Sequence, residues 1–492
     1  MHSLSPHIDR SPAKYVYVYI RHFVNSDRST SDSRALYRQH RAMPTPRLPL
    51  ELHDATMEWL YMDANGRAHL EACSLASRTL RSAAQRTLLR TVDIDISDPK
   101  RTLSAFHGLS AGESFLKHVR ELFIDQVNRD GGDLLDPSLL ARVLAQVPGL
   151  QVLGIYNIKL SPTRAFPAML SPSASGDPPR FNLAELRLDF TWGQSFAGVL
   201  EILALFGEVG KLTVDSLPCH PGVVVPKVRA IERSPYIPQL PYDARPLRIQ
   251  VKEVDFREQA AFGDYGPIFL LQTIQRTPTV GYLTTIAIHI ETYQQVAELG
   301  EVLRICCSTI KRCELDLRYL QYLPDNDRGE TYINASEWSK LGLHCCKSLK
   351  FLSLRGYLDP HSPTSHSSPR WDYAACPMFL DILASASLST LKRVQLDLLL
   401  YGDSSAQHLV TTMFDTPTHK FDLRRLRGLL SNWSALEGLS CYLWCLHHDQ
   451  RGEDLVDLVD ERISTAYARW YDNGKIEVKK MHLERPMDPE IE

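Results

Sequence analysis

The chain has 492 residues, more than one compact core normally holds, so its length predicts either several domains or one elongated repeat array. Hydrophobic residues make up 44% of the sequence and charged residues 23%, which is ordinary for a water-soluble protein. Because 55 Lys and Arg stand against 58 Asp and Glu, the net charge of -3 argues against the basic excess that nucleic-acid binding requires.

Residues 1–43 form a polar N-terminal extension. They are rich in Ser, Arg, Asp and His, and the strand-like run Tyr15 to Ile20 has no neighbouring strand pattern with which to pair. We therefore expect mostly disorder in this segment. Met43 directly precedes the first well-patterned segment, which suggests the hypothesis that translation starts there.

Residues 44–95 have a dense helical pattern. A proline, Pro49, stands where the first helix is expected to begin, and the turn-forming run Asp63 to Gly66 separates this helix from a second one. Apolar residues recur at helical spacing at Leu52, Met57, Leu60, Leu70, Cys73, Leu75, Leu80, Ala84 and Leu88. A segment this short cannot bury so much apolar surface alone, so it must dock onto the rest of the chain or onto a partner.

Residues 96–450 repeat a loose unit in which an apolar helical run precedes a short alternating strand. The apolar pairs of the strands recur at separations of roughly 26 to 45 residues, at Leu122/Ile124, Leu153/Ile155, Leu186/Leu188, Leu212/Val214, Val254/Phe256, Ile286/Ile288, Leu315/Leu317, Leu352/Leu354, Val394/Leu396 and Leu439/Cys441. A one-sided strand and a helix cannot close a core, so such units stack on their neighbours. The pattern predicts an α/β fold, an irregular leucine-rich-repeat-like solenoid or horseshoe with a curved parallel sheet.

The end of the chain is expected to close this array. Residues 451–475 include Leu455, Val459 and Ile463 at helical spacing, which predicts a C-terminal capping helix. Residues 476–492 are expected to form a tail.

One side chain of each strand is a candidate for contact with a partner. The residue after each apolar pair points to the open face of the sheet, and these positions change from acidic to basic along the array. The candidates for a client-facing surface are Asp125, Asp189, Asp215, Arg257, His289, Arg318 and Arg355. This order of charges would favour a partner of complementary charge, and a chance distribution of solvated charges is the alternative.

The sequence contains no motif of a catalytic or cofactor-binding site. Nucleophile elbows, phosphate-binding glycine loops and zinc-protease motifs are absent, so we expect neither an enzyme nor a bound cofactor. The cluster Cys441, Cys445, His447 and His448 lies in an apolar segment without a second cysteine pair, which predicts core thiols and not a metal site. Ten scattered cysteines and the lack of a long apolar run indicate a reduced, cytoplasmic or nuclear protein without a membrane span.

Residues 48–92 resemble the F-box, and the layout of the whole chain resembles fungal F-box proteins with a leucine-rich-repeat-like C-terminal region. The likeness rests on Leu48-Pro49-x-Glu51-Leu52, on Leu60, on Leu70-x-Ala72-Cys73-Ser74-Leu75-Ala76-Ser77-Arg78 and on Leu88-Leu89-Arg90-Thr91-Val92. Thr56 and Leu80 depart from the family pattern, which has an apolar residue and a tryptophan at these positions.

The resemblance implies a substrate-recognition adaptor of an SCF ubiquitin ligase, part of the ubiquitin-like conjugation pathway. Its helical domain would dock on a Skp-type subunit of the cullin-RING ligase, and its solenoid would present a client protein of unspecified identity. By analogy the adaptor-binding residues are Leu48, Pro49, Leu52, Leu60, Leu75 and Arg78. The alternative is a non-catalytic repeat scaffold without a ligase link, in which the same residues hold the helices together. Exposure of Leu48, Pro49 and Leu75 would favour the adaptor, and burial would favour the scaffold.

Overall fold

The computed structural model describes residues 50–62, 66–76, 78–95, 114–125, 135–158, 160, 180–190, 196–216, 247–256, 266–290, 293–318, 338–357, 375–386, 389–399, 405–415, 421–446 and 450–483. They belong to two compact units, residues 1–192 and 193–492. The 1–43 extension, for which disorder is predicted, and residues 484–492 lie outside the described ranges.

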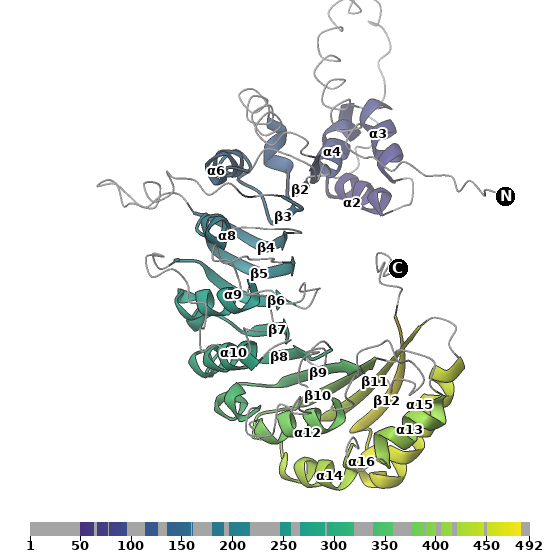
Figure 1. Ribbon diagram of the computed structural model, residues 1–492. Coiled ribbons are helices and arrows are strands. Elements are labelled where there is room, and N and C mark those ends of the chain that lie inside the picture. Colours follow the sequence, from purple (N-terminus) through teal and green to yellow (C-terminus); the bar gives the residue numbers. More distant parts are fainter. Residues whose placement is uncertain are drawn as a thin grey trace, which may run out of the picture. The chain divides into compact units, whose positions relative to one another are not determined.

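Among the described residues of the first unit, helices α2, α3 and α4 come before the strands, and β1, β2, β3 and β4 pair in chain order and run parallel (Figure 1). The elements are α2 (Leu50–Tyr61), α3 (Gly66–Ala76), α4 (Arg78–Leu88), β1 (Thr91–Asp95), η1 (Ser114–His118), β2 (Glu121–Asp125), α6 (Pro137–Leu144), β3 (Val152–Tyr156) and β4 (Phe181–Asp189). Helix α6 begins at Pro137, and the side chain of Asp136 accepts a hydrogen bond from the Ser138 backbone N–H, which caps the helix.

The second unit continues the same alternation, and β5 to β12 also pair in chain order with every pair parallel. Helices cover one face of these strands (Figure 1). The elements are α8 (Phe196–Leu203), β5 (Phe206–Ser216), β6 (Gln250–Phe256), α9 (Gly266–Gln275), η3 (Pro278–Gly281), β7 (Thr285–His289), α10 (Tyr293–Ile305), β8 (Arg312–Asp316), η5 (Ser339–Leu341), η6 (Leu343–Cys345), β9 (Phe351–Tyr357), α12 (Ala375–Ser385), β10 (Arg393–Leu399), α13 (Ala406–Phe414), α14 (Leu423–Asn432), β11 (Gly438–Leu446), α15 (Gln450–Ala466), α16 (Ala468–Asp472) and β12 (Ile476–Leu483). Within the described residues, no helix combines the length and the apolar character that crossing a membrane requires.

The apolar pairs of neighbouring strands stand side by side and form the core. In the first unit Leu122, Leu153 and Leu186 are aligned across β2, β3 and β4, and all three side chains are buried. In the second unit the first residues of the pairs form one ladder, Leu212, Val254, Ile286, Cys313, Leu352, Val394, Leu439 and Ile476. The α/β fold with parallel strands and helices in repeated units is therefore confirmed.

Strand β8 departs from the predicted register by two residues. Cys313 and Leu315 stand beside Leu352 and Leu354, where the sequence pattern placed Leu315 and Leu317. Because Cys313, Leu315 and Leu317 alternate without a break, the pattern offers two windows of equal quality, and a buried cysteine packs like a small apolar residue. Asp316 therefore occupies the position on the open face that the sequence pattern predicted for Arg318.

The C-terminal boundaries also differ from the prediction. The expected capping helix at 451–475 consists of α15 and α16, and the expected tail at 476–492 begins with strand β12, which pairs with β11. Ile476 and Val478 are an apolar pair like those of the other strands, and Ile476 is buried. Helix α15 is thus one more connecting helix of the repeat, and β12 ends the described strands.

The N-terminal segment 44–95 contains more elements than predicted. The second expected helix is two helices, α3 and α4, and the segment ends with β1, which already pairs with β2. Helix α3 begins at Gly66, where a Cβ atom would lie 2.1 Å from the Leu60 carbonyl oxygen. Only glycine permits this close approach of the two chain segments.

Candidate functional site

The three N-terminal helices enclose a small core of their own. Met57 on α2, Leu70 on α3, and Ala83 and Ala84 on α4 are buried together. Four partly buried side chains pack around them, Leu60, Cys73, Leu80 and Leu88. Each helix thus packs one apolar face against its two neighbours. Apolar side chains on the other faces of these helices lie outside this small core.

Several large apolar side chains of these helices do face solvent. Leu52, Trp59, Tyr61 and Met62 on or directly after α2, and Leu75 on α3, are between 40% and 82% exposed. Leu52, Trp59 and Met62 recur at intervals of seven and three residues, so they lie on one side of the helix, away from Met57 and Leu60. We call Leu52, Trp59, Met62 and Leu75 the apolar helix surface.

The residues predicted to bind an adaptor fall into three groups. Leu52 and Leu75 belong to the apolar helix surface, whereas Leu60 packs against the core of the cluster. Leu48, Pro49 and the side chain of Arg78 lie outside the described residues. Trp59 and Met62 were not predicted, although their spacing from Leu52 marks a second apolar face on a helix that already has one.

A charged pocket lies where the helices meet the first strands. It has a volume of about 280 Å³ and is lined by Asp54, Glu58, Arg86, Thr87, Arg90, His118, Arg120 and Gln151. Its charges pair mainly with each other, because Arg86 bonds Asp54 and Arg90 lies 3.8 Å from Glu58 and 3.7 Å from Glu121. Burial lowers the pKa of His118, and the positive charges of Lys117, Arg86 and Arg120 lower it further. These ion pairs therefore connect α2 with α4 and with the start of β2.

The second candidate is a row of polar side chains on the strand face opposite the helices. Register places His289, Asp316, Arg355, Asp397, Tyr442 and Lys479 next to one another on β7 to β12. We call these six residues the polar row. Its members Asp316, Arg355 and Asp397 alternate in charge, so the predicted change from acidic to basic residues is wrong for this part of the sheet. Directly opposed charges of unlike sign stabilise neighbouring strands.

The other predicted client-facing residues are spread over the strands. Asp125 and Asp189 flank Tyr156 in the register of the first unit. Asp215 is half-buried at the end of β5, and Arg257 lies outside the described residues. Arg318 follows β8 and is not part of the polar row, but its guanidinium bonds Asp316 at 2.8 Å.

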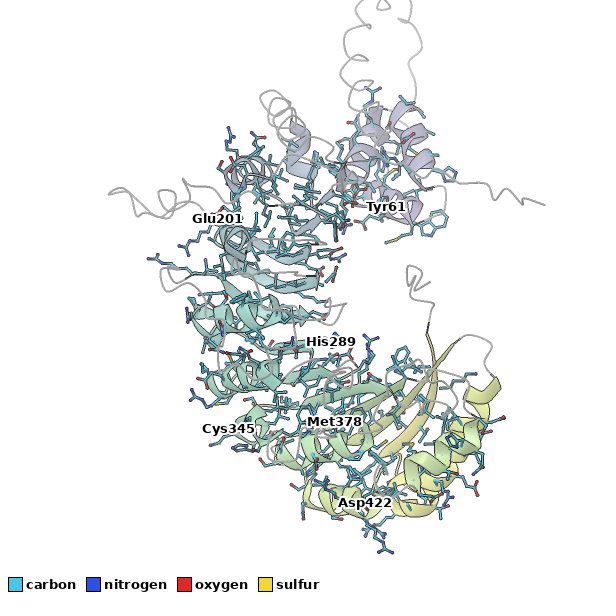
Figure 2. The ribbon with its side chains drawn as sticks, in the orientation of Figure 1. Tyr61, Glu201, His289, Cys345, Met378 and Asp422 are labelled. Carbon is cyan, nitrogen blue, oxygen red and sulfur yellow. The ribbon has the colours of Figure 1, made fainter. Side chains whose placement is uncertain are left out.

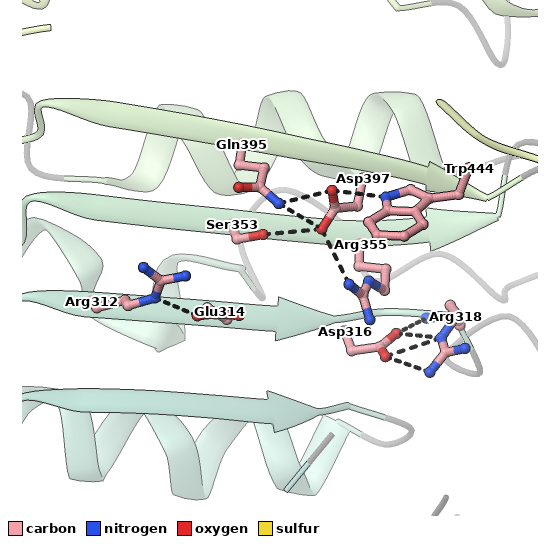
Figure 3. A network of polar contacts seen from close by, with 9 residues as sticks. All are labelled: Arg312, Glu314, Asp316, Arg318, Ser353, Arg355, Gln395, Asp397 and Trp444. Carbon is pink, nitrogen blue, oxygen red and sulfur yellow. Dashed lines mark hydrogen bonds and ion pairs between the residues drawn. The ribbon is translucent and has the colours of Figure 1, made fainter. Parts of the chain in front are cut away.

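Asp397 is the centre of the network in Figure 3. Its carboxylate accepts hydrogen bonds from Gln395 Nε2 at 2.9 and 3.0 Å, from Trp444 Nε1 at 3.0 Å, and from Ser353 and Arg355 at 3.5 Å each. These donors come from three adjacent strands. Since the Asp397 side chain is only 2% exposed, they replace the water that its charge has lost.

Two arginines of this face lie over aromatic rings. The guanidinium of Arg312 is 4.0 Å from the centre of the Phe351 ring, and that of Arg355 is 5.6 Å from the Trp444 ring. Arg312 also bonds Glu314 on its own strand (Figure 3). Each guanidinium is thus held by a carboxylate and a ring together, which restricts its orientation.

His289, labelled in Figure 2, is buried at the end of β7. Burial lowers its pKa from 6.5 to about 4; the charge of Asp316 raises the pKa and that of Arg318 lowers it. The folded protein therefore holds this imidazole neutral at physiological pH.

Acidification is expected to destabilise the protein through His289. Between pH 6.5 and about 4 the unfolded chain binds a proton that the folded chain does not, so the free energy of unfolding falls as the pH falls through this window. The full effect is about 3 kcal/mol at the acid end. Denaturant unfolding at pH 7 and pH 5 measures the part of this effect that falls between these two pH values. His289→Gln, which cannot titrate, is expected to lose less stability over this interval. An equal loss in both proteins would contradict the assignment.

The described cysteines are free thiols, and most are buried. Burial raises the pKa of Cys306 to about 11 and that of Cys346 and Cys441 to about 12, so these thiols stay protonated and unreactive. Among the described residues no group of three or more metal-ligating side chains occurs. Cys441 packs in the core, and the side chain of Cys445 together with His447 and His448 lies outside the described residues.

Comparison with known proteins adds little. No family model matches the chain, and no curated protein matches it. Among solved structures, a chain from the crystal structure of the Rad7 and Elc1 complex in yeast is 11% identical, and the match covers 80% of this chain and 94% of that one with a TM-score of 0.23. At this identity and TM-score the match carries no argument about function.

Proposed function

We propose that the chain is a non-catalytic adaptor. Helices α2 to α4 would dock on a Skp-type subunit of a cullin-RING ubiquitin ligase, in the cytoplasm or the nucleus, while the strand-bearing part holds a client protein. The exposed apolar side chains support the proposal that these helices bind a partner. The resemblance of residues 48–92 to the F-box supports the proposal that this partner is a Skp-type subunit. The adaptor would raise the local concentration of client lysines at the ligase without any bond chemistry of its own.

One observation carries this proposal. Of the six large hydrophobic side chains that are exposed among the described residues, five lie between Leu52 and Leu75, and Tyr282 is the sixth. An apolar group concentrated in one short segment of a water-soluble chain is typical of a surface that binds another protein. Aromatic and long aliphatic side chains of this kind supply most of the binding energy of an interface.

Helix α4 is joined to the first strands by a short, hydrogen-bonded connection. Such a connection suits an adaptor that holds its client at a fixed distance from the ligase. Only Leu89 and Arg90 separate α4 from β1, and the Arg90 carbonyl accepts backbone hydrogen bonds from Arg120 at 2.8 Å and Glu121 at 2.9 Å. Thr91 also donates a hydrogen bond to Glu121 at 3.1 Å. A docked ligase subunit would therefore have a defined orientation relative to β1 and β2.

The proposal is tested with the purified full-length protein and a purified Skp-type subunit. Leu52→Asp/Leu75→Asp is expected to weaken binding at least about 100-fold, because each anchor contributes on the order of 2 kcal/mol and a charge cannot enter an apolar groove. Calorimetry or biolayer interferometry measures the dissociation constant. Both side chains are exposed, so the circular dichroism spectrum and melting temperature should stay unchanged.

Tyr282→Asp is the matched control, because it places the same charge on an exposed hydrophobic position outside the helices. The affinity of this variant for the Skp-type subunit should equal that of the unmodified protein. No binding by the unmodified protein, or equal binding by the double variant, would reject the ligase link. The chain would then be a repeat scaffold whose helices α2 to α4 serve another purpose.

A further inference from the structure

We propose that Arg312, Arg318 and Arg355 form a binding site for an acidic, extended peptide segment of a partner protein. We call these three residues the arginine face. This assignment concerns the strands of the second unit, goes beyond the docking of α2 to α4, and is tested without a ligase subunit, so either proposal can fail alone.

The first step is the difference in exposure between the charges of opposite sign. The side chains of Arg312, Arg318 and Arg355 are 48%, 21% and 27% exposed, whereas those of their partners Glu314, Asp316 and Asp397 are 12%, 1% and 2% exposed. The carboxylates are therefore more deeply buried, and the guanidinium groups are closer to solvent. Although the three pairs are neutral in sum, a molecule that approaches this face meets positive charge first.

The second step is the fixed orientation of the guanidinium groups. Arg312 lies over Phe351, and Arg355 lies over Trp444. The buried Asp397 is itself held by Trp444, Gln395 and Ser353 (Figure 3). A guanidinium that is already positioned loses little conformational entropy when it binds a second carboxylate. Planar, bidentate pairing with carboxylates is the recognition for which arginine is best suited.

The third step is the spacing along the strands. Arg312 stands beside Phe351, and Arg355 follows Phe351 by four residues on β9. In an extended chain, two residues four positions apart are separated by about 13 Å, and their side chains point to the same side. An extended peptide with two acidic residues four positions apart therefore matches the backbone positions of Arg312 and Arg355, and Phe351 and Trp444 add apolar contact area beside them.

The test uses the full-length chain and a fluorescent ten-residue peptide that carries two glutamates four positions apart. Fluorescence anisotropy should show binding that weakens with added salt, and a peptide with glutamines in place of the glutamates should bind at least about tenfold more weakly. Arg312→Gln/Arg355→Gln should reduce affinity for the acidic peptide by a similar factor. Equal binding of the two peptides, or unchanged binding by this variant, would overturn the proposal.

Two controls keep the result interpretable. Arg304→Gln removes a more exposed arginine from α10 and should leave peptide affinity unchanged, and a matching loss there would mean unspecific attraction and overturn the proposal. Arg312→Gln alone replaces a half-exposed side chain at the start of β8, so its several-fold loss can be measured in a folded protein even where the double variant melts early.

The chain's own C-terminal segment is the competing occupant, because it contains Glu484, Asp488, Glu490 and Glu492. A variant that ends at Leu483 separates the two cases. Unchanged affinity for the acidic peptide would support a site for a partner. Affinity that rises tenfold or more on removal of residues 484–492 would assign the arginine face to this segment and overturn the proposal.

Discussion

Replacing Asp397 by alanine is expected to lower the free energy of unfolding by about 3 to 5 kcal/mol, because it leaves a buried polar network without its acceptor. Trp444, Gln395, Ser353 and Arg355 all donate to this one carboxylate. Alanine accepts none of these bonds, and the space it leaves is lined by polar groups of β9, β10 and β11. Urea unfolding followed by circular dichroism measures the loss.

Asp397→Asn is the informative companion, because it keeps the size of the side chain and one acceptor oxygen. We expect it to retain the bond from Trp444 and to lose the charged interaction with Arg355, so its cost should be smaller than that of alanine. Asp415→Ala breaks an ion pair with Arg462 in which both side chains are about half exposed, and it should cost less than about 1 kcal/mol. A loss for Asp397→Ala as small as that for Asp415→Ala would show that the network adds nothing to stability.

Gly300→Ala is expected to destabilise the second unit by about 3 kcal/mol, the upper end of what overpacking usually costs. A Cβ atom at position 300 would lie 1.9 Å from the Lys340 carbonyl oxygen and 3.2 Å from the Leu341 Cα. Both are backbone atoms of η5, so no side-chain rotation relieves the clash, and α10 must move away from η5. The buried residues Leu299 and Leu341 would lose packing contacts as a consequence.

Gly428→Ala is the matched control, since a Cβ atom at this helical glycine has nothing within 4 Å. Alanine is the better helix former, so this change in α14 should raise the free energy of unfolding by about 0.5 to 1 kcal/mol. The two substitutions are chemically identical and are expected to have opposite signs. A stabilising Gly300→Ala, measured in the same urea titration, would mean that α10 and η5 do not approach each other this closely.

The repeat architecture was predictable because it depends on a local pattern. Alternation of apolar residues places them on one side of a strand whatever the neighbouring strands are, and this criterion found the pairs of β2 to β7 and of β9 to β11. It failed at β8, where three alternating residues left two possible registers, and at β12, where Ile476 and Val478 stand next to the charged residues Lys479 and Lys480. The register of parallel strands is settled by their neighbours in space.

The candidate sites were predictable to different degrees. Leu52 and Leu75 were identified through a family resemblance, and the structure finds them exposed, whereas Leu60 has the same apolar character and packs inside. Sequence spacing alone does not decide which of two apolar helix faces a core covers. Trp59 and Met62 belong to the exposed face because α3 and α4 pack on the other side of α2.

The sequence by itself determined which face of most strands lines the core, since burial of apolar groups follows from the two-residue periodicity of each strand. Only the tertiary structure decided the charges on the opposite face. Asp316, Arg355 and Asp397 follow one another along the chain at intervals of some forty residues, and the strand register brings them side by side. This register cannot be read from the sequence, because the loops between the strands differ in length. Coulomb interactions depend on distance in space, so the order of charges in the sequence did not reveal that carboxylates would be buried beneath the arginine face.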